Sequence, residues 1–380
     1  MKILMVSMTS MHFFRWTEQL RDAGHEIYWF DVMDTKKETE RLNWVNQIIK
    51  WRIKYNYPYR YFVKKKLPKL YRFIQKFNDN DIATVFEQKL NEIKPDLVHS
   101  FAMQLSCIPI LDIMLKQPQI KWVYSSWGSD VYFSHGLNMN EDKIRACFNR
   151  IDYLITDCER DYKIATEKGF TNMFLGVFPG NGGVDFAKLP ETNLSKRKII
   201  LVKGYNFGVG RGLNIVKALS KLQPEQLKEF KIIVYGADQL ITEYVSKNEN
   251  LSQVDIEIHS MKKTIPNAEL IAIMGKSYLH IGNGISDGIP NSMIEAMGMG
   301  AFPIQSNPGN ATAELIHDEK NGLLINNADD IDEIQNRIQF ALLNPEIVKS
   351  AFEYNSLFIR QNYNRDFIKP KITALYESIH

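Results

Sequence analysis

Cysteine is scarce in this chain of 380 residues, which contains only Cys107, Cys147 and Cys158. Three is an odd number, and their spacing matches no metal-ligand pattern, so neither a disulfide framework nor a zinc site is expected. We therefore expect three reduced thiols in a cytosolic protein, and we predict no metal ligands.

Long apolar runs are also missing. The N-terminal stretch MKILMV is too short for the apolar region of a signal peptide. No apolar run elsewhere approaches the roughly 20 residues that a membrane-spanning helix needs. The sequence has no low-complexity tract and no internal repeat, and its 44% hydrophobic and 24% charged residues are typical of a folded globular protein. We expect a protein that neither spans a membrane nor is exported.

Acidic residues are absent from residues 41–77, which contain eleven Lys or Arg and ten aromatic residues. Because the whole chain has a net charge of +3, the remainder carries −8. Basic residues interleaved with Trp and Tyr suit an anionic membrane surface, where each contributes about 1 kcal/mol. Nucleic acid would also suit this segment. The plainest alternative is a solvated helical face with buried aromatic residues.

Short apolar runs alternate with amphipathic helical stretches from the N-terminus onward, beginning with a strand at 2–8, a helix from 13 and a second strand before 32. The alternation restarts at 198, after a Gly- and Pro-rich stretch at 179–197. Since 380 residues exceed the usual size of one core, the sequence predicts two doubly wound α/β domains with a linker near 186–196. The other expected strands are 95–101, 121–128, 152–158, 172–178, 198–204, 230–236, 254–260, 277–284 and 301–306.

Residues 286–304, SDGIPNSMIEAMGMGAFPI, predict a turn that enters a helix directly. Gly288 permits a tight turn, Pro290 suits the first helical position, and Asn291 and Ser292 leave the helix start open to a ligand. Free backbone N–H groups and the helix dipole then form an anion site that suits phosphate.

Two acids flank this anion site, Asp287 before the helix and Glu295 in its second turn. Because like charges repel, hydroxyl groups are more natural partners for these acids than phosphate. The glycine-rich stretch 203–212 follows a strand and carries Lys203 and Arg211, which could clamp a diphosphate. A diphosphate flanked by hydroxyl-bearing groups describes a nucleotide sugar.

The stretch DGIPNSMIEAMGMGAFP resembles the signature of the retaining GT-B glycosyltransferases of family 4, the glycosyl transferases group 1. That signature has two acids separated by seven residues, a Gly after the first, and EAM…G.P from the second. Here Asp287 replaces the usual first Glu. The segments GHEIYWFD, GNGGVD and SNPGNATAELIHDEKNGLLI and the C-terminal FIRQNYNRDFIKPKITALYESI extend the resemblance over nearly the whole chain.

The resemblance implies a GT-B architecture, with two Rossmann-like domains facing a central cleft. Residues 1–186 would bind the acceptor and 187–360 the nucleotide sugar, while 361–380 would form a C-terminal helix that packs back on the first domain.

The resemblance also assigns roles to residues. Glu295 would hold the donor ribose and Asp287 would face the sugar hydroxyls, with backbone amides around Asn291, Ser292 and Met293 meeting phosphate or sugar. Relatives usually have GR at the strand end and KG at the helix start, so the two cations are exchanged here. Either order places two positive charges at the leaving diphosphate. The implied donor-binding residues are Lys203, Gly204, Arg211, Gly212, Asp287, Gly288, Asn291, Ser292, Met293 and Glu295, and Lys203, Arg211 and Asp287 are also assigned to catalysis.

On the acceptor side, SSWGSDV resembles the HGSD segment of the family, with Trp127 where a histidine is common. Asp130 matches, and is the catalytic candidate that either positions the acceptor or accepts its proton. The first loop, SMTSMHFFRW, lacks the paired glycines of many relatives, so His12 is assigned to the acceptor.

The expected activity is transfer of a hexose from a UDP- or GDP-sugar, with retention of configuration and no metal. The expected acceptor is a cell-surface polysaccharide or lipid-linked oligosaccharide at the inner face of the cytoplasmic membrane, reached through residues 41–77. The alternatives are a transferase acting on a small soluble acceptor, or a nucleic-acid-binding protein using 41–77, although no nucleic acid is expected as partner. A nicotinamide-dependent dehydrogenase is excluded, because SMTSMH rather than a glycine fingerprint follows the first strand.

Overall fold

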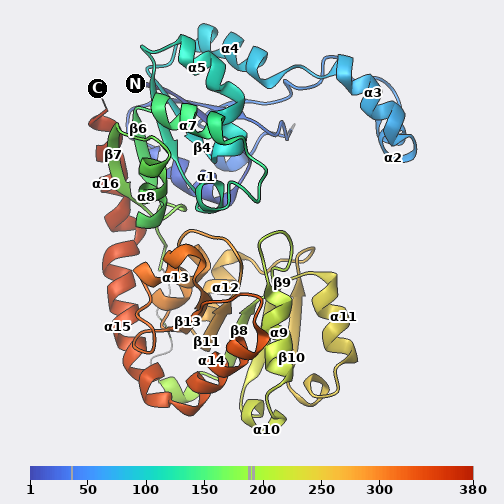
Figure 1. Cartoon of the computed structure of the whole chain (residues 1–380), viewed down its shortest axis with the longest axis vertical. Helices are drawn as coiled ribbons and strands as arrows, with labels where there is room; N and C mark the ends of the chain where they lie inside the picture. Colours follow the sequence, from blue (N-terminus) through green and yellow to red (C-terminus); the bar gives the residue numbers. More distant parts are fainter. Residues whose placement is uncertain (36, 187–189, 191–192, 380) are drawn as a thin grey trace. The chain divides into compact units, whose positions relative to one another are not determined.

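The computed structural model describes residues 1–35, 37–186, 190 and 193–379 (Figure 1). Internal contacts divide the chain into two compact units. The first contains Met1–Asp157, Asp161–Gly182 and the chain from Ile372 on, and the second contains Cys158–Arg160 and Gly183–Lys371. No helix in the described ranges combines the length and the apolar character that crossing a bilayer would require.

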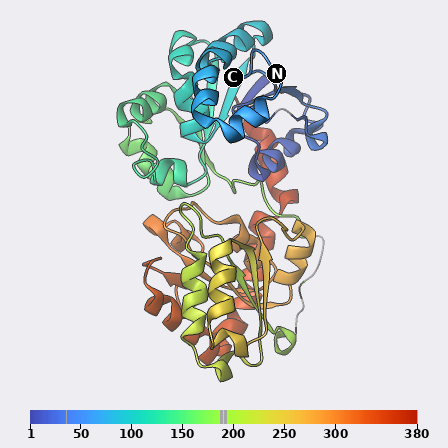
Figure 2. The same ribbon diagram turned by 90° about the vertical axis from the view of Figure 1, so that its right-hand side faces the viewer.

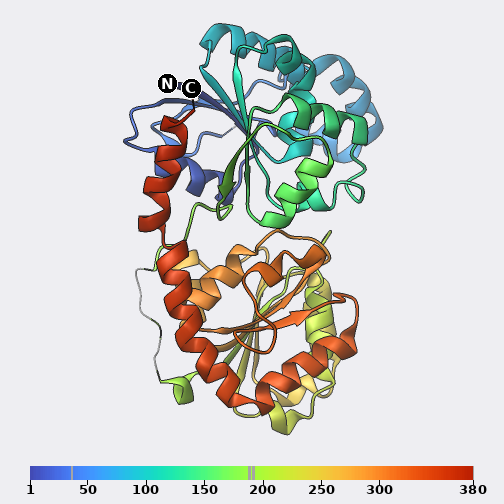
Figure 3. The same cartoon turned by 60° about the vertical axis from the view of Figure 1, so that its left-hand side comes forward.

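The first unit is built on a parallel sheet in the order β3-β2-β1-β4-β5-β6-β7. Its central strand β4 is buried along its whole length, as expected for a parallel sheet with helices on both faces (Figure 3). The strands are β1 Lys2–Ser7, β2 Glu26–Asp31, β3 Asn46–Ile48, β4 Leu97–Phe101, β5 Lys121–Ser125, β6 Tyr153–Thr156 and β7 Met173–Val177.

The second unit has a parallel sheet in the order β10-β9-β8-β11-β12-β13, the strand order of a Rossmann fold. Figure 2 shows α9 and α11, in yellow-green and yellow, in front of this sheet. The strands are β8 Ile199–Lys203, β9 Lys231–Ala237, β10 Ile256–Ser260, β11 Ser277–Gly282, β12 Phe302–Ser306 and β13 Leu323–Ile325.

Some helices begin at a capping side chain: Asp81 accepts the N–H of Thr84 at the start of α4, and Asn140 accepts that of Lys143 at the start of α7. In chain order the helices are α1 Met11–Thr17, α2 Arg60–Lys66, α3 Pro68–Asn78, α4 Ile82–Ile93, α5 Leu111–Lys116, α6 Ser129–Tyr132, α7 Glu141–Arg150, α8 Glu159–Glu167, α9 Gly212–Ser220, α10 Pro224–Leu227, α11 Gln239–Lys247, α12 Asn267–Met274, α13 Asn291–Gly298, α14 Ile331–Leu343, α15 Pro345–Tyr363 and α16 Arg365–Glu377.

The fold class predicted from the sequence is confirmed, with two doubly wound α/β units, and every expected strand lies in one of the two sheets. The three-residue strands β3 and β13 were not predicted. The predicted linker 186–196 and the domain boundary at 187 fall partly on 187–189 and 191–192, which lie outside the described residues. Contacts divide the units between Gly182 and Gly183.

The C-terminal segment differs from the single helix predicted for 361–380. Helix α15 runs on to Tyr363 and α16 begins at Arg365, because Asn364 between them has an extended backbone with φ −65° and ψ 135°. The last turns of α16 belong to the first unit.

Tyr376 anchors α16 in the core of the first unit. Its hydroxyl accepts a hydrogen bond from Trp16 Nε1 at 2.9 Å and lies 2.6 Å from His99 Nδ1. Nε2 of His99 lies 2.8 Å from Ser125 Oγ, so both ring nitrogens have hydroxyl partners. Burial lowers the pKa of His99 to about 3, which favours the neutral ring.

Candidate active site

The strand order of the second unit reverses at β8, whose neighbours are β9 and β11. Loops that leave the carboxyl ends of adjacent strands at such a reversal diverge, and ligands of open α/β sheets bind there. The glycine-rich loop follows β8 and the turn with Asp287 follows β11, so both sequence motifs lie at this point of the sheet.

The glycine-rich loop folds tightly because it lacks side chains at two positions. A Cβ atom on Gly212 would lie 2.6 Å from the carbonyl carbon of Gly204, and one on Gly204 would lie 2.7 Å from Val234 Cγ1. The N–H of Gly212 donates to Tyr205 O at 2.9 Å. The two glycines predicted for donor binding thus bring the start of α9 against the end of β8.

Backbone hydrogen bonds join this loop to the one that follows β11. Gly210 and Gly284 form an antiparallel bridge, Ile285 N donates to Val209 O at 2.9 Å, and Arg211 N donates to Asn283 O at 3.0 Å. The two sequence motifs, about eighty residues apart in the chain, therefore form one continuous surface.

Lys203 and Arg211, predicted to clamp a diphosphate, have different environments. The Arg211 guanidinium forms an ion pair with Asp329 at 2.8 Å and donates to the carbonyls of Gly208 at 3.0 Å and Gly210 at 2.9 Å. The side chain of Lys203 makes no hydrogen bond or ion pair with the described residues, but its charge lowers the pKa values of Asp287 and His280. The Lys203 ammonium therefore keeps its hydrogen-bond donors for a ligand, whereas Arg211 stabilises its own loop.

Asp287 is half-buried in the turn between β11 and α13. Its Oδ1 accepts the N–H of Gly288 at 3.0 Å, and Arg160 Nη1 donates to its carbonyl oxygen at 2.9 Å. Burial raises the pKa of the Asp287 carboxyl, while the charges of Lys203 and Arg160 oppose that rise. The carboxyl is thus held close to two cations in a poorly solvated place.

Helix α13 begins at Asn291, and Pro290, predicted to be the first helical residue, is instead the N-cap with an extended backbone. Met293, whose amide was expected to face the ligand, instead donates that N–H to Pro290 O at 3.0 Å, and its side chain is fully buried. Its amide is used by the first helical turn, so the prediction of donor contacts at this helix start is limited to Asn291 and Ser292.

Glu295 is buried in α13, with 5% of its surface exposed. Its charge and the Ser292 side chain both act on the hydroxyl of Tyr235, whose pKa is raised chiefly by burial. The same hydroxyl lies 3.0 Å from His280 Nε2, and burial with the charge of Lys203 lowers the pKa of His280 to about 3. A polar cluster of neutral and acidic groups thus lies beneath the start of α13.

Several of these neighbours were not predicted. Tyr235 lies near the carboxyl end of β9, next to β8, and that position was the available signal. His280 lies within β11, where a buried strand position gives no sign of its polar partners. Arg160 and Asp329 lie more than 100 residues from the groups they contact, and no local pattern indicates them.

In the first unit, Asp130 is buried rather than open to a substrate. Its Oδ2 accepts hydrogen bonds from Met103 N at 2.8 Å and Tyr124 Oη at 2.5 Å, and its Oδ1 accepts from Trp127 N at 2.9 Å. Burial raises the pKa of Asp130, and these hydrogen bonds partly offset the rise. The contacts give Asp130 the role of fixing the loops after β4 and β5, and its catalytic role stays a prediction.

Replacing Asp130 with Asn should lower stability rather than affect nucleotide binding in the second unit. An amide puts an N–H group where the carboxylate accepts hydrogen bonds, so at least one buried donor loses its partner, at a cost of about 1–3 kcal/mol. Denaturant unfolding measures this loss, and Asp142→Asn on exposed α7 is the matched control. Unchanged stability with lost turnover would instead support the predicted catalytic role.

His12 and Trp127, the two acceptor-side candidates, are brought together by the fold. His12 lies in α1 after β1, and Trp127 in the loop after β5. Their ring centroids are 5.8 Å apart, and Trp127 also contacts Phe101 at 5.9 Å. Both side chains are half-buried at the carboxyl side of the first sheet.

Two family models match the chain. That of the glycosyl transferases group 1 matches residues 188–357, and that of a glycosyl transferase 4-like family matches 80–158. Together they span well over half of the sequence and include both the glycine-rich loop and the acid-containing helix. No protein of curated function matches the sequence significantly.

Solved structures share the fold over the full length of the chain. Sucrose-phosphate synthase from Thermosynechococcus elongatus has a TM-score of 0.71 at 14% identity and covers 100% of this chain and 98% of its own. Anabaena HepE in complex with UDP has a TM-score of 0.66 at 13% identity, covering 100% of both chains. The lipopolysaccharide outer core galactosyltransferase WaaB has a TM-score of 0.65 at 15% identity and covers 100% of this chain and 99% of its own.

The fold and the two family matches define a glycosyltransferase of GT-B type. Within it, residues 188–357 match the glycosyl transferases group 1.

Proposed function

We propose that this protein transfers a hexose from a UDP- or GDP-sugar, with retention of configuration and without a metal ion, to a lipid-linked oligosaccharide or cell-surface polysaccharide at a membrane surface. The observation that carries the proposal is the joining of the glycine-rich loop to the loop before α13, which places Lys203, Asp287 and the start of α13 at one sheet edge. Complexes of HepE with UDP and with UDP-glucose support a nucleotide sugar as donor.

The same residues support the proposal of charge neutralisation without a metal ion. The leaving diphosphate would meet the ammonium of Lys203 and the positive end of the α13 dipole, which together stabilise developing negative charge. The pKa of Asp287 is raised. Its carboxyl would accept a hydrogen bond from a sugar hydroxyl when ionised, or donate one to that hydroxyl when protonated. Glu295 would bind the ribose hydroxyls.

The acceptor assignment rests on residues 41–77, whose basic and aromatic side chains suit an anionic bilayer. WaaB, a lipopolysaccharide galactosyltransferase, has the same fold. A small soluble acceptor is the second candidate, since sucrose-phosphate synthase also has this fold. Turnover that is independent of vesicles would favour the second candidate.

Calorimetric titration with UDP, GDP and ADP, with NAD as control and a chelator present, tests the donor proposal. We expect micromolar binding of one nucleoside diphosphate, corresponding to about −8 kcal/mol, and no binding of NAD. Absence of binding by all three nucleotides, or binding that requires a divalent metal, would contradict the proposal.

A further inference from the structure

Arg160 lies outside both sequence motifs, yet its guanidinium contacts the turn that carries Asp287. Its Nη1 donates to Asp287 O at 2.9 Å and to Pro308 O at 2.7 Å. One nitrogen can serve both carbonyls because it carries two hydrogens. Only 8% of the Arg160 surface is exposed. Arg160 therefore joins the turn before α13 to the loop that follows β12.

The backbone of Arg160 is itself held by an acid of the second unit. Glu314 Oε1 accepts the N–H of Arg160 at 2.9 Å, and Glu314 Oε2 accepts that of Glu159 at 2.8 Å. Both hydrogen bonds are charge-assisted, and they fix the first residues of α8. Arg160 is thus held at both ends, by Glu314 at its backbone and by two loop carbonyls at its guanidinium.

The two loops that Arg160 joins lie at the carboxyl edge of the second sheet, where ligands of open α/β sheets bind. Strands β11 and β12 are neighbours, and Gly284 N donates to Ser306 Oγ at 2.9 Å where they end. Arg160 adds a contact nearer to the acid, because its hydrogen bond is to the carbonyl of Asp287 itself. The position of the Asp287 side chain therefore depends on Arg160.

The charge of Arg160 also acts on the Asp287 carboxyl. Burial raises the pKa of that carboxyl, while Lys203 at the end of β8 and Arg160 at the start of α8 both lower it. A neutral donor, such as an amide, could hold the same two carbonyls but would not favour the ionised acid. Arg160 thus has an electrostatic effect in addition to its hydrogen bonds.

We propose that Arg160 is a positioning residue of the donor site, which fixes the turn that carries Asp287 and keeps its carboxylate ionised toward the donor sugar. The inference rests on the role proposed above for Asp287. Arg160 acts through Asp287, whereas the nucleoside diphosphate is assigned to Lys203 and Glu295. Loss of Arg160 should therefore slow the reaction of the sugar and leave the nucleoside diphosphate bound as before.

Two variants separate the charge of Arg160 from its hydrogen bonds, with hydrolysis of UDP-glucose or GDP-glucose by water as a rate that needs no acceptor. Arg160→Met removes both, so we expect kcat to fall about tenfold to a hundredfold, as displacement of a reacting group by about 1 Å can cause. The pKa of Asp287 should rise further, which moves the acidic limb of the pH–rate profile to higher pH. Arg160→Lys keeps the charge without the planar fork, so the limb should return toward the parental pH while kcat stays reduced.

A double-mutant cycle with Asp287→Asn tests whether Arg160 acts through that carboxylate. Arg160→Met should change kcat by less than about twofold when Asp287 is already Asn, because residues that act through one another are not additive. Additive losses in the cycle would overturn the inference. Parental kcat with an unmoved acidic limb in folded Arg160→Met would also overturn it, as would equal losses of kcat and of nucleoside-diphosphate affinity.

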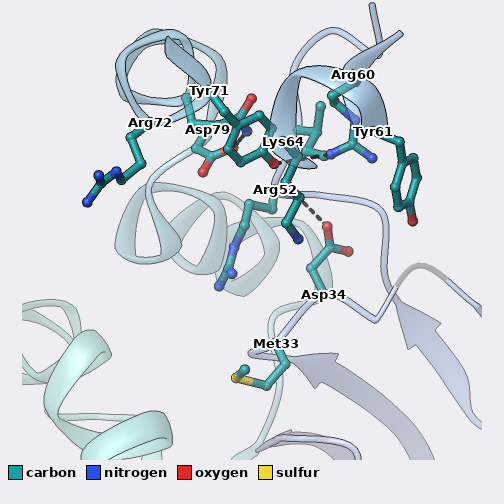
Figure 4. Close-up of a pocket in the computed structure, with 11 residues that line it drawn as sticks. Met33, Asp34, Arg52, Arg60, Tyr61, Lys64, Tyr71, Arg72 and Asp79 are labelled. Atoms are coloured by element: carbon teal, nitrogen blue, oxygen red, sulfur yellow. Dashed lines mark hydrogen bonds between the residues drawn. The ribbon is translucent and has the colours of Figure 1, made fainter. Parts of the chain in front are cut away.

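Arg52→Met is the matched control for loss of a guanidinium that holds a backbone carbonyl. Arg52 Nη2 donates to Val32 O at 3.0 Å, and its side chain lines a pocket of about 470 Å³ in the first unit (Figure 4). This variant should keep the nucleoside-diphosphate affinity and the acidic limb of the parent.

Glu314→Gln keeps the inference testable if Arg160→Met does not fold. It weakens the anchor of the Arg160 backbone, so it should give a smaller shift of the acidic limb in the same direction, and an unmoved limb would overturn the inference. Failure of the parent protein to bind any nucleoside diphosphate would instead contradict the donor proposal, so the two failures are distinguishable.

Discussion

Replacing Lys203 with Met should lower kcat by about a hundredfold to a thousandfold, the usual effect of removing one group that stabilises charge in the transition state. Lys203 ends β8 beside the glycine-rich loop, and its side chain makes no ion pair or hydrogen bond with the described residues. Its charge is thus available to a departing diphosphate. Methionine keeps most of the length of the side chain and removes only the charge.

Two matched variants isolate this effect. Lys198→Met removes a cation that pairs with Glu229 just before the same strand, and should leave kcat unchanged. Arg211→Met removes the second predicted cation, but Asp329 already neutralises that guanidinium, so we expect a smaller kinetic effect and a lower Tm from the loosened loop. A larger kinetic loss in Arg211→Met than in Lys203→Met would contradict this assignment.

The loss of Lys203 should also change the titration of its neighbour. Lys203 opposes the rise in the pKa of Asp287, so without it that pKa should rise further above its usual range. The Asp287 carboxylate would then become protonated at a higher pH. If its ionised form is required for turnover, the acidic limb of the pH–rate profile should shift to higher pH in the Lys203→Met variant. An acidic limb at the parental pH would show that the charge of Lys203 does not act on Asp287.

The sequence was sufficient for the regular parts of the fold, because its strands are continuous apolar runs flanked by turn residues. Strand β11 is buried at every position, and such a run predicts a central parallel strand whatever its neighbours are. Strand β3 has Asn46 and Gln47 within three residues, and it exists only because β2 offers it a partner. Pairing of this kind has no local signal.

For the candidate site, the sequence indicated motifs but not the environments of the charged side chains. The glycine-rich stretch after a strand indicated Gly204 and Gly212, and the resemblance to the family signature indicated Asp287 and Glu295. The environment of a charged group is a property of the folded chain. The sequence predicted equal roles for two cations, and only the contact between Arg211 and Asp329, 118 residues apart, separates them.

Burial likewise distinguishes acids that the sequence treats alike. Asp130 and Asp287 were both assigned to catalysis from family patterns. In the folded chain Asp130 accepts three hydrogen bonds from its own unit, while Asp287 lies half-buried between Lys203 and Arg160. An acid that is saturated with protein donors organises loops, and one that faces cations through poorly solvated space is placed for a ligand.

Replacing Glu295 with Gln should weaken binding of the preferred nucleoside diphosphate at least tenfold, about 1.4 kcal/mol, because two hydroxyls bind an ionised carboxylate more strongly than an amide. Glu346→Gln, at an exposed site in the first turn of α15, is the matched control and should bind like the parent. Circular dichroism of both variants checks that α13 still packs, since Glu295 is buried.

The ribose assignment makes a sharper claim than loss of affinity, because it names the atoms involved. Inorganic pyrophosphate lacks a ribose, so Glu295→Gln should bind it as the parent does, whereas Lys203→Met should bind it less well. The 2′-deoxy nucleotide should bind the parent more weakly than the ribonucleotide, and this difference should shrink in Glu295→Gln, as a double-mutant cycle between the hydroxyl and the carboxylate requires. If Glu295→Gln weakens pyrophosphate and nucleotide equally, Glu295 acts on the helix start and the phosphate rather than on the ribose.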